Sequence, residues 1–182
     1  MTARLRLQPI RLDDADAVAA VCAIFTDPAT WKHMPTARPG DDQAVEAYLA
    51  GQADSWQKAG LGRWVIRLQD SGDCTVIGVG GCDMADPATG TWDLGYRLGT
   101  TWWGHGYATE VARAGLDAAH HLRPDLPVTA NVVENNPASW HILDKLGLHL
   151  VWTGHGTVSE LTYRVYADRP LDDATLQRVI AK

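Results

Sequence analysis

Cysteine, phenylalanine and long apolar runs are scarce in this sequence. Its 182 residues include one phenylalanine and three cysteines, an odd number that does not suggest a disulfide framework. Cys74 and Cys82 lie eight positions apart in one predicted strand, beyond bridging distance. No window approaches the roughly 20 apolar residues of a membrane span, and the start lacks the apolar segment of a signal peptide. These absences predict a reduced, cytoplasmic protein that is neither exported nor embedded in a membrane.

A strong charge of either sign is also absent. The sequence has 16 Lys and Arg against 22 Asp and Glu, a formal net charge of −6. This balance argues against nucleic acid or a membrane surface as partner and fits a cationic partner better, although it also serves solubility alone. The histidines and cysteines show neither a His-Glu-x-x-His nor a Cys-x-x-Cys pattern, so no metal site is predicted.

The length and the composition predict one globular domain over residues 1–182. The chain is 46% hydrophobic and 21% charged, which is ordinary globular usage and excludes disorder, collagen and coiled coil. We expect one hydrophobic core to stabilise a domain of this size without a metal or a disulfide.

The periodicity of apolar residues predicts a mixed α+β domain. Alternating patterns predict strands at 5–12, 64–69, 75–84, 91–98, 128–133, 148–153 and 158–166. Helical patterns with capping residues predict helices at about 13–25, 41–58, 104–122 and 137–146. Turns are predicted at 70–73 and 86–90, a loop or broken helix at 27–42, and a short helix or a frayed tail at 170–182. Three consecutive strands with short turns predict an antiparallel meander in the middle of the chain.

The strongest chemical signal is the junction TWWGHGYATE, where a strand ends in two glycines and a helix begins. Gly104 and Gly106 let backbone N–H groups converge on an anion at the positive end of the helix dipole. This pattern predicts a phosphate or pyrophosphate site, although a tight turn before a core helix would look the same. A P-loop and a dinucleotide fingerprint are excluded, because the Gly-Lys-Ser/Thr and the third glycine or alanine are missing.

Two longer segments resemble one known family. The segment GTWDLGYRLGTTWWGHGYATEVARAGLDAA resembles the central motif of the GNAT superfamily of acyl-CoA-dependent N-acetyltransferases, and ENNPASWHILDKLGLHLV resembles its later motif. The first segment and DPATWKHMP resemble the Rim-type branch, which is similar to ribosomal-protein-alanine N-acetyltransferases. The resemblance covers about residues 4–166. It implies the GNAT fold, an α+β fold with a mixed, mostly antiparallel twisted sheet of about seven strands flanked by about four helices.

The resemblance also implies which residues bind acetyl-CoA as co-substrate. Leu98 and Gly99 end a strand that splays from its neighbour and admits the pantetheine arm, and the Leu98 N–H faces the thioester carbonyl. Asn136 and Ser139 lie beside the pantetheine and the sulfur. The loop that gives its backbone N–H groups to the pyrophosphate consists of Trp103, Gly104, His105, Gly106, Tyr107, Ala108 and Thr109.

The sequence departs from the family pattern at two positions. Thr101 stands where Arg or Gln is frequent, so a side-chain contact to the coenzyme is lost while the backbone donors remain. Leu143 stands where many members carry the Tyr that protonates the leaving thiolate. Ser139 or water must then serve, and a thiol with a pKa of about 8.5 needs little acid assistance.

Asp93 is the leading base for the acceptor amine, which must lose a proton. Strand alternation sends Asp93 and Arg97 to one face and Trp92, Leu94, Tyr96 and Leu98 to the other. The corresponding family residue is frequently Glu. Because Asp is shorter, a bridging water is expected, and an ion pair between Asp93 and Arg97 is the structural alternative.

The implied reaction moves an acetyl group to a primary amine by direct attack in a ternary complex. The acceptor is a peptide or protein N-terminus, or a small cationic amine, and Trp31, His33 and Met34 are predicted to line its pocket. The missing Tyr leaves a non-catalytic acyl-CoA-binding or regulatory protein as an alternative, and an interaction module with a structural glycine turn as a third. A homodimer is also considered, since twofold pairs are the commonest oligomers.

Overall fold

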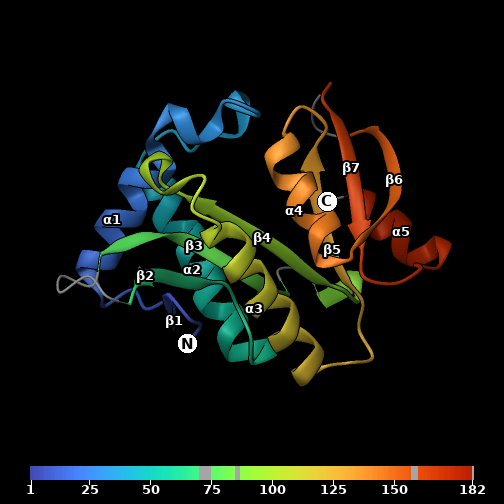
Figure 1. Ribbon diagram of the computed structural model, residues 1–182, viewed down its shortest axis with the longest axis horizontal. Coiled ribbons are helices and arrows are strands. Elements are labelled where there is room, and N and C mark those ends of the chain that lie inside the picture. Colours follow the sequence, from blue (N-terminus) through green and yellow to red (C-terminus); the bar gives the residue numbers. More distant parts are fainter. Residues whose placement is uncertain (70–74, 85–86, 157–159, 182) are drawn as a thin grey trace.

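The computed structural model describes residues 1–69, 75–84, 87–156 and 160–181. They form one seven-stranded sheet in the order β1-β2-β3-β4-β5-β7-β6 (Figure 1). The strands are β1 (Leu5–Pro9), β2 (Trp64–Leu68), β3 (Val76–Asp83), β4 (Trp92–Leu98), β5 (Val128–Val133), β6 (His149–His155) and β7 (Thr162–Ala167). The helices are α1 (Ala15–Thr26), α2 (Asp42–Ala59), α3 (Tyr107–Leu122), α4 (Pro137–Leu146) and α5 (Asp173–Ile180). The expected α+β fold with a mixed sheet is confirmed.

All neighbouring strands pair antiparallel except β4 and β5, which are parallel. The β2–β3–β4 meander follows from three strand patterns separated by short breaks. β1 lies at the edge of the sheet and ends at Pro9, where the missing N–H costs no ladder bond.

Helices cover both faces of the sheet. Buried side chains of α3 and α4, such as Val111, Leu116 and Leu143, pack with Trp92 and Leu94 in one core cluster. A second cluster joins α1 and α2 to the opposite face of β2 and β3. The sheet therefore separates two cores, and a side chain on β4 faces one or the other according to its parity.

Several boundaries differ from those predicted. The first strand stops at Pro9 instead of residue 12, and α3 begins at Tyr107 because Gly106, with a left-handed φ of 79°, caps it. The breaker-rich stretch 27–42 contains two short 3₁₀ helices, η1 (Pro28–Trp31) and η2 (Pro35–Ala37). The tail forms α5, since the Asp172 side chain accepts a hydrogen bond from the Thr175 N–H as an N-cap. The predicted turn at 70–73, Cys74 and residue 86 lie outside the described residues.

Candidate active site

The sheet opens between β4 and β5. The two strands pair only at Trp92↔Val128 and Asp93↔Thr129. Beyond these pairs β4 stays on β3 as far as Leu98, whereas β5 follows β7, so the two strands diverge (Figure 1). We call the region between the diverging strands, beyond Asp93 and toward Leu98 and Gly99 at the end of β4, the opening.

Backbone groups of β4 face this opening. The Gly99 N–H donates to the Ile77 oxygen at 3.0 Å, and Leu98 lies opposite Gly78 in the antiparallel register. This pattern makes Leu98 a non-hydrogen-bonded position, whose own N–H and C=O point away from β3. The Leu98 oxygen accepts a hydrogen bond from Trp103 Nε1 at 2.9 Å, in line with that direction. The Leu98 N–H therefore faces the opening.

The start of α3 adjoins the opening and presents a row of backbone donors. A 3₁₀ turn, η4 (Thr100–Trp102), and Gly104 and Gly106, both at φ 79°, lead into the helix. The first intrahelical bond runs from the Glu110 N–H to the Gly106 oxygen, so the N–H groups of 107–109 have no acceptor within the helix. The loop is exposed, with Trp103 48% accessible. This end of α3 can bind an anion.

The side chain of Arg4, which precedes β1, binds this loop. Its guanidinium donates to the His105 oxygen at 2.8 Å, pairs with Glu110 at 2.7 Å and lies 4.7 Å from the centre of the Tyr107 ring. It thus fixes the first turn of α3 and adds a cation beside the loop. Nothing in the sequence pattern indicated this contact, because the partners are about a hundred residues apart.

Polar groups of α4 lie across the opening from β4. Asn136 Nδ2 donates to Ser139 Oγ at 3.0 Å, and its side chain makes no capping hydrogen bond to α4. The Tyr96 hydroxyl donates to the Ser139 carbonyl oxygen at 3.2 Å, and burial raises the pKa of Tyr96 to about 12. Leu143 is buried in the core and contributes no polar group. Tyr96, which the sequence analysis did not assign to the site, is therefore a protonated donor there.

Asp93 forms an ion pair, but its partner is Arg63. Arg63 Nη2 lies 2.6 Å from Asp93 Oδ2. The predicted pairing of Asp93 with Arg97 is wrong, because Arg97 stacks 3.3 Å from the ring centre of Trp31 and donates to the Thr30 carbonyl oxygen. Burial lowers the pKa of Arg97 to about 10. The carboxylate faces the α1 and α2 side of the sheet, as the alternation of β4 predicted.

The predicted acceptor-lining residues lie on the same side. Trp31 is buried and donates through Nε1 to the Phe25 oxygen at 2.6 Å. His33 is partly buried, and burial together with the charge of Arg97 lowers its pKa. Met34 Sδ accepts a hydrogen bond from the Tyr163 hydroxyl at 3.4 Å, so this segment reaches from the α1 side to β7.

Comparisons with known proteins agree with this geometry. A model of the acetyltransferase (GNAT) domain matches residues 4–149. The chain belongs to the GNAT acetyltransferase family. An uncharacterised N-acetyltransferase of Bacillus licheniformis, p20, is 28% identical over 145 residues, which cover 80% of this chain and 79% of p20.

Solved structures of acetyltransferases have the same fold. An acetyltransferase from Agrobacterium tumefaciens superposes with a TM-score of 0.75 at 23% identity, covering 93% of each chain. RimL, a ribosomal L7/L12 α-N-protein acetyltransferase in complex with coenzyme A, gives 0.70 at 18% identity, covering 94% of this chain and 96% of RimL. Spermidine N-acetyltransferase from Vibrio cholerae, in complex with coenzyme A and spermine, gives 0.69 at 12% identity, covering 90% and 94%.

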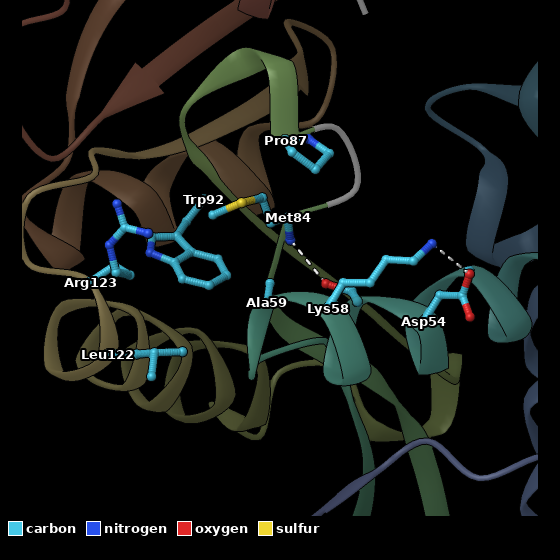
Figure 2. A pocket seen from close by; sticks show the side chains of 10 residues that line it. Asp54, Lys58, Ala59, Met84, Pro87, Trp92, Leu122 and Arg123 are labelled. Atoms are coloured by element: carbon cyan, nitrogen blue, oxygen red, sulfur yellow. Dashed lines mark hydrogen bonds and ion pairs between the residues drawn. The ribbon is translucent and has the colours of Figure 1, made fainter.

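A separate hollow of about 460 Å³ lies at the other end of α3 (Figure 2). It is lined by residues of α2, by Met84 and Trp92, and by Leu122 and Arg123 at the end of α3. Because α3 has 16 residues at about 1.5 Å each, this hollow lies far from the glycine loop. It is distinct from the opening between β4 and β5.

Within the parts of the chain that the structure describes, no group of three or more His, Cys, Asp or Glu side chains could hold a metal ion. None of the described helices is both long and apolar enough to cross a bilayer.

Proposed function

We propose that this GNAT protein transfers an acetyl group from acetyl-CoA to a primary amine in a ternary complex. The observation that carries the proposal is the opening between β4 and β5, which adjoins the exposed N-terminus of α3. An extended arm in this opening meets backbone donors of β4, while its anionic end meets the helix N-terminus. A membership of the Rim-type branch and a cytoplasmic location belong to the same proposal.

The residues of the opening fit the coenzyme by their donor chemistry. The backbone N–H groups of 104–109 hold the pyrophosphate, which needs no lysine. The Trp103 N–H, expected in the same set, already donates to the Thr100 oxygen at 3.2 Å. Leu98 and Gly99 align the pantetheine arm, and Asn136 and Ser139 lie on its other side. The pair of glycines at positive φ keeps this loop free of side chains where an anion must approach.

The chemistry requires one proton acceptor and one stabilised oxygen. Acetyl-CoA supplies a thioester, whose carbon–sulfur bond breaks as the carbon–nitrogen bond to the amine forms. The Leu98 N–H donates to the carbonyl oxygen as negative charge develops there. Asp93 accepts the amine proton, directly or through a water molecule. Ser139 or water returns a proton to the thiolate.

An α-amine is the acceptor that this arrangement serves best, and a small cationic amine is the second candidate. Arg63 stabilises the charged form of Asp93 and so makes it a weaker base than an unpaired carboxylate. An α-amino group titrates near pH 8 and a lysine near pH 10, so an α-amine needs less assistance. Both acceptor classes should be tested, because the chain is similar in structure to RimL and to spermidine N-acetyltransferase.

Calorimetric titration with acetyl-CoA, coenzyme A and an NAD control tests the coenzyme site. Gly106→Trp places a bulky side chain in the loop and should abolish binding of acetyl-CoA. Gly147→Trp is the matched control, because Gly147 also has a positive φ, of 85°, with nothing within 4 Å, but ends α4 away from the loop. We expect Gly147→Trp to bind acetyl-CoA as the unaltered protein does.

Each alternative has its own outcome. Binding of acetyl-CoA without turnover on a panel of peptides, polyamines and aminoglycosides would favour a non-catalytic acyl-CoA-binding or regulatory protein. No binding of any ligand would leave the glycine loop as a structural turn in an interaction module. A homodimer is tested separately by sedimentation.

A further inference from the structure

A second aspartate faces Asp93 from the neighbouring strand. In the antiparallel register of β3 and β4, Asp83 lies directly opposite Asp93, so their side chains share one face of the sheet. Asp83 is 1% exposed, whereas the Asp93 side chain is 21% exposed. Two like charges in such a position destabilise a sheet unless something between them compensates.

Arg63 lies between the two carboxylates. Its Nη2 is 2.6 Å from Asp93 Oδ2 and 3.5 Å from Asp83 Oδ1, so one nitrogen serves both. Its Nη1 donates to the Tyr48 hydroxyl at 3.1 Å. Gln52 of α2 closes the cluster, because its Nε2 donates to Asp83 Oδ2 and its Oε1 accepts from the Arg63 backbone N–H.

The cluster is short of positive charge. It contains two carboxylates and one guanidinium, and Asp83 Oδ1 is buried with no hydrogen-bond donor among the described residues. Tyr48 and Cys82 add no further negative charge, because burial raises the pKa of each and keeps both neutral. Arg97 of β4 lies on the same face, but it binds Trp31 and the Thr30 carbonyl instead.

We infer that Asp83 is a positioning residue for Asp93, which fixes Arg63 and draws part of its charge away from the reacting carboxylate. This inference rests on the proposed role of Asp93 as proton acceptor. An arginine alone stabilises the charged form of a carboxylate, whereas a second carboxylate nearby disfavours it. Asp83 therefore keeps Asp93 more basic than a simple ion pair would. Because Asp83 is buried, it acts through Arg63 and does not touch the acceptor.

Carboxyl-carbon NMR titration of Asp93 tests the inference without an acceptor. In the Asp83→Asn variant Arg63 serves one carboxylate, so the titration midpoint of Asp93 should fall by about one pH unit or more. Asp83→Glu keeps the charge and should keep the midpoint near its original value. Tyr48→Phe removes a contact to the same guanidinium without removing a charge, and is the control for mere repacking. An unchanged or raised midpoint in Asp83→Asn overturns the inference.

Two further measurements complete the test. If Asp83→Asn does not fold, Asp83→Ser gives the same comparison, since it is also uncharged and smaller. With an acceptor found by the amine panel, Asp83→Asn should lower kcat about tenfold and move the acid limb of the kcat profile to lower pH, without changing the KM for acetyl-CoA. Absence of turnover by the unaltered protein would overturn the proposed function, whereas an unchanged Asp93 midpoint overturns this inference alone.

Discussion

The two faces of β4 differ in composition, although they alternate along the same seven residues. One face carries Trp92, Leu94 and Leu98, which are buried against α3 in an apolar core. The other carries Asp93, Gly95 and Arg97. Asp93 pairs with Arg63, and Arg97 lies over the Trp31 ring. A single strand therefore anchors the sheet with one face and supplies the proposed chemistry with the other.

The largest expected effect comes from removing the proposed base on the polar face. Asp93→Asn keeps the shape of the side chain and a contact to Arg63 but loses the proton acceptor. We expect kcat to fall about 10²- to 10⁴-fold, with the affinity for acetyl-CoA unchanged. Steady-state kinetics and calorimetry measure the two quantities. Full activity with an unaltered pH–rate profile would show that Asp93 is not the base.

One methyl group added on the polar face should reduce turnover more than stability. A Cβ at Gly95 would lie 2.7 Å from Arg63 Nη2 and 2.8 Å from its guanidinium carbon. Gly95→Ala therefore displaces Arg63 from Asp93. We expect kcat to fall about tenfold, since proton transfer depends on the placement of the base. An unchanged kcat together with a lower free energy of unfolding in Gly95→Ala would contradict this expectation.

A glycine-to-alanine substitution on the apolar side should reduce stability more than turnover. A Cβ at Gly115 of α3 would lie 2.9 Å from Gly81 Cα, a backbone atom that cannot move aside. Gly115→Ala should lower the free energy of unfolding by about 1–3 kcal/mol, with kcat little changed. Gly51→Ala is the control, because this helical glycine has nothing within 4 Å and alanine favours helix there. Urea denaturation of both variants measures the difference.

Acid should weaken the contacts that Asp168 makes with His120, near the end of α3, and with the start of β5. Burial alone would raise the pKa of Asp168, but hydrogen bonds from Arg169, His120 and the Val128 N–H outweigh it and lower the pKa. The stabilisation is therefore complete above the unfolded-state pKa of about 3.9 and is lost as pH falls through the lower folded value. We expect Asp168→Asn to be less stable at pH 7 and to lose less stability between about pH 5 and pH 2. Thermal unfolding at several pH values checks this, and parallel curves for the two proteins would contradict it.

Local sequence patterns predicted the elements and the glycine loop before α3, because both depend on near neighbours. Alternation gave the faces of β4, and two glycines marked the start of α3. The partner of Asp93 was predicted wrongly, since Arg97 is close in sequence while Arg63 is brought in by the β2–β3–β4 meander. The contacts made by Arg4 and Tyr96 were missed for the same reason, as tertiary packing alone creates them.

Because β4 pairs with β5 at only two positions, one side of β4 resembles that of an edge strand, although β4 lies in the centre of the sheet. β4 is the fourth of seven strands, yet beyond Asp93 one side of its backbone has no strand beside it. Exposed edges recruit other strands and promote aggregation, so proteins usually cover them. A bound extended ligand is a cover of this kind. We therefore expect the amides of Tyr96 and Leu98 to exchange hydrogen like edge amides in the free protein. Acetyl-CoA, the proposed co-substrate, should slow that exchange and raise the stability of the protein when it binds.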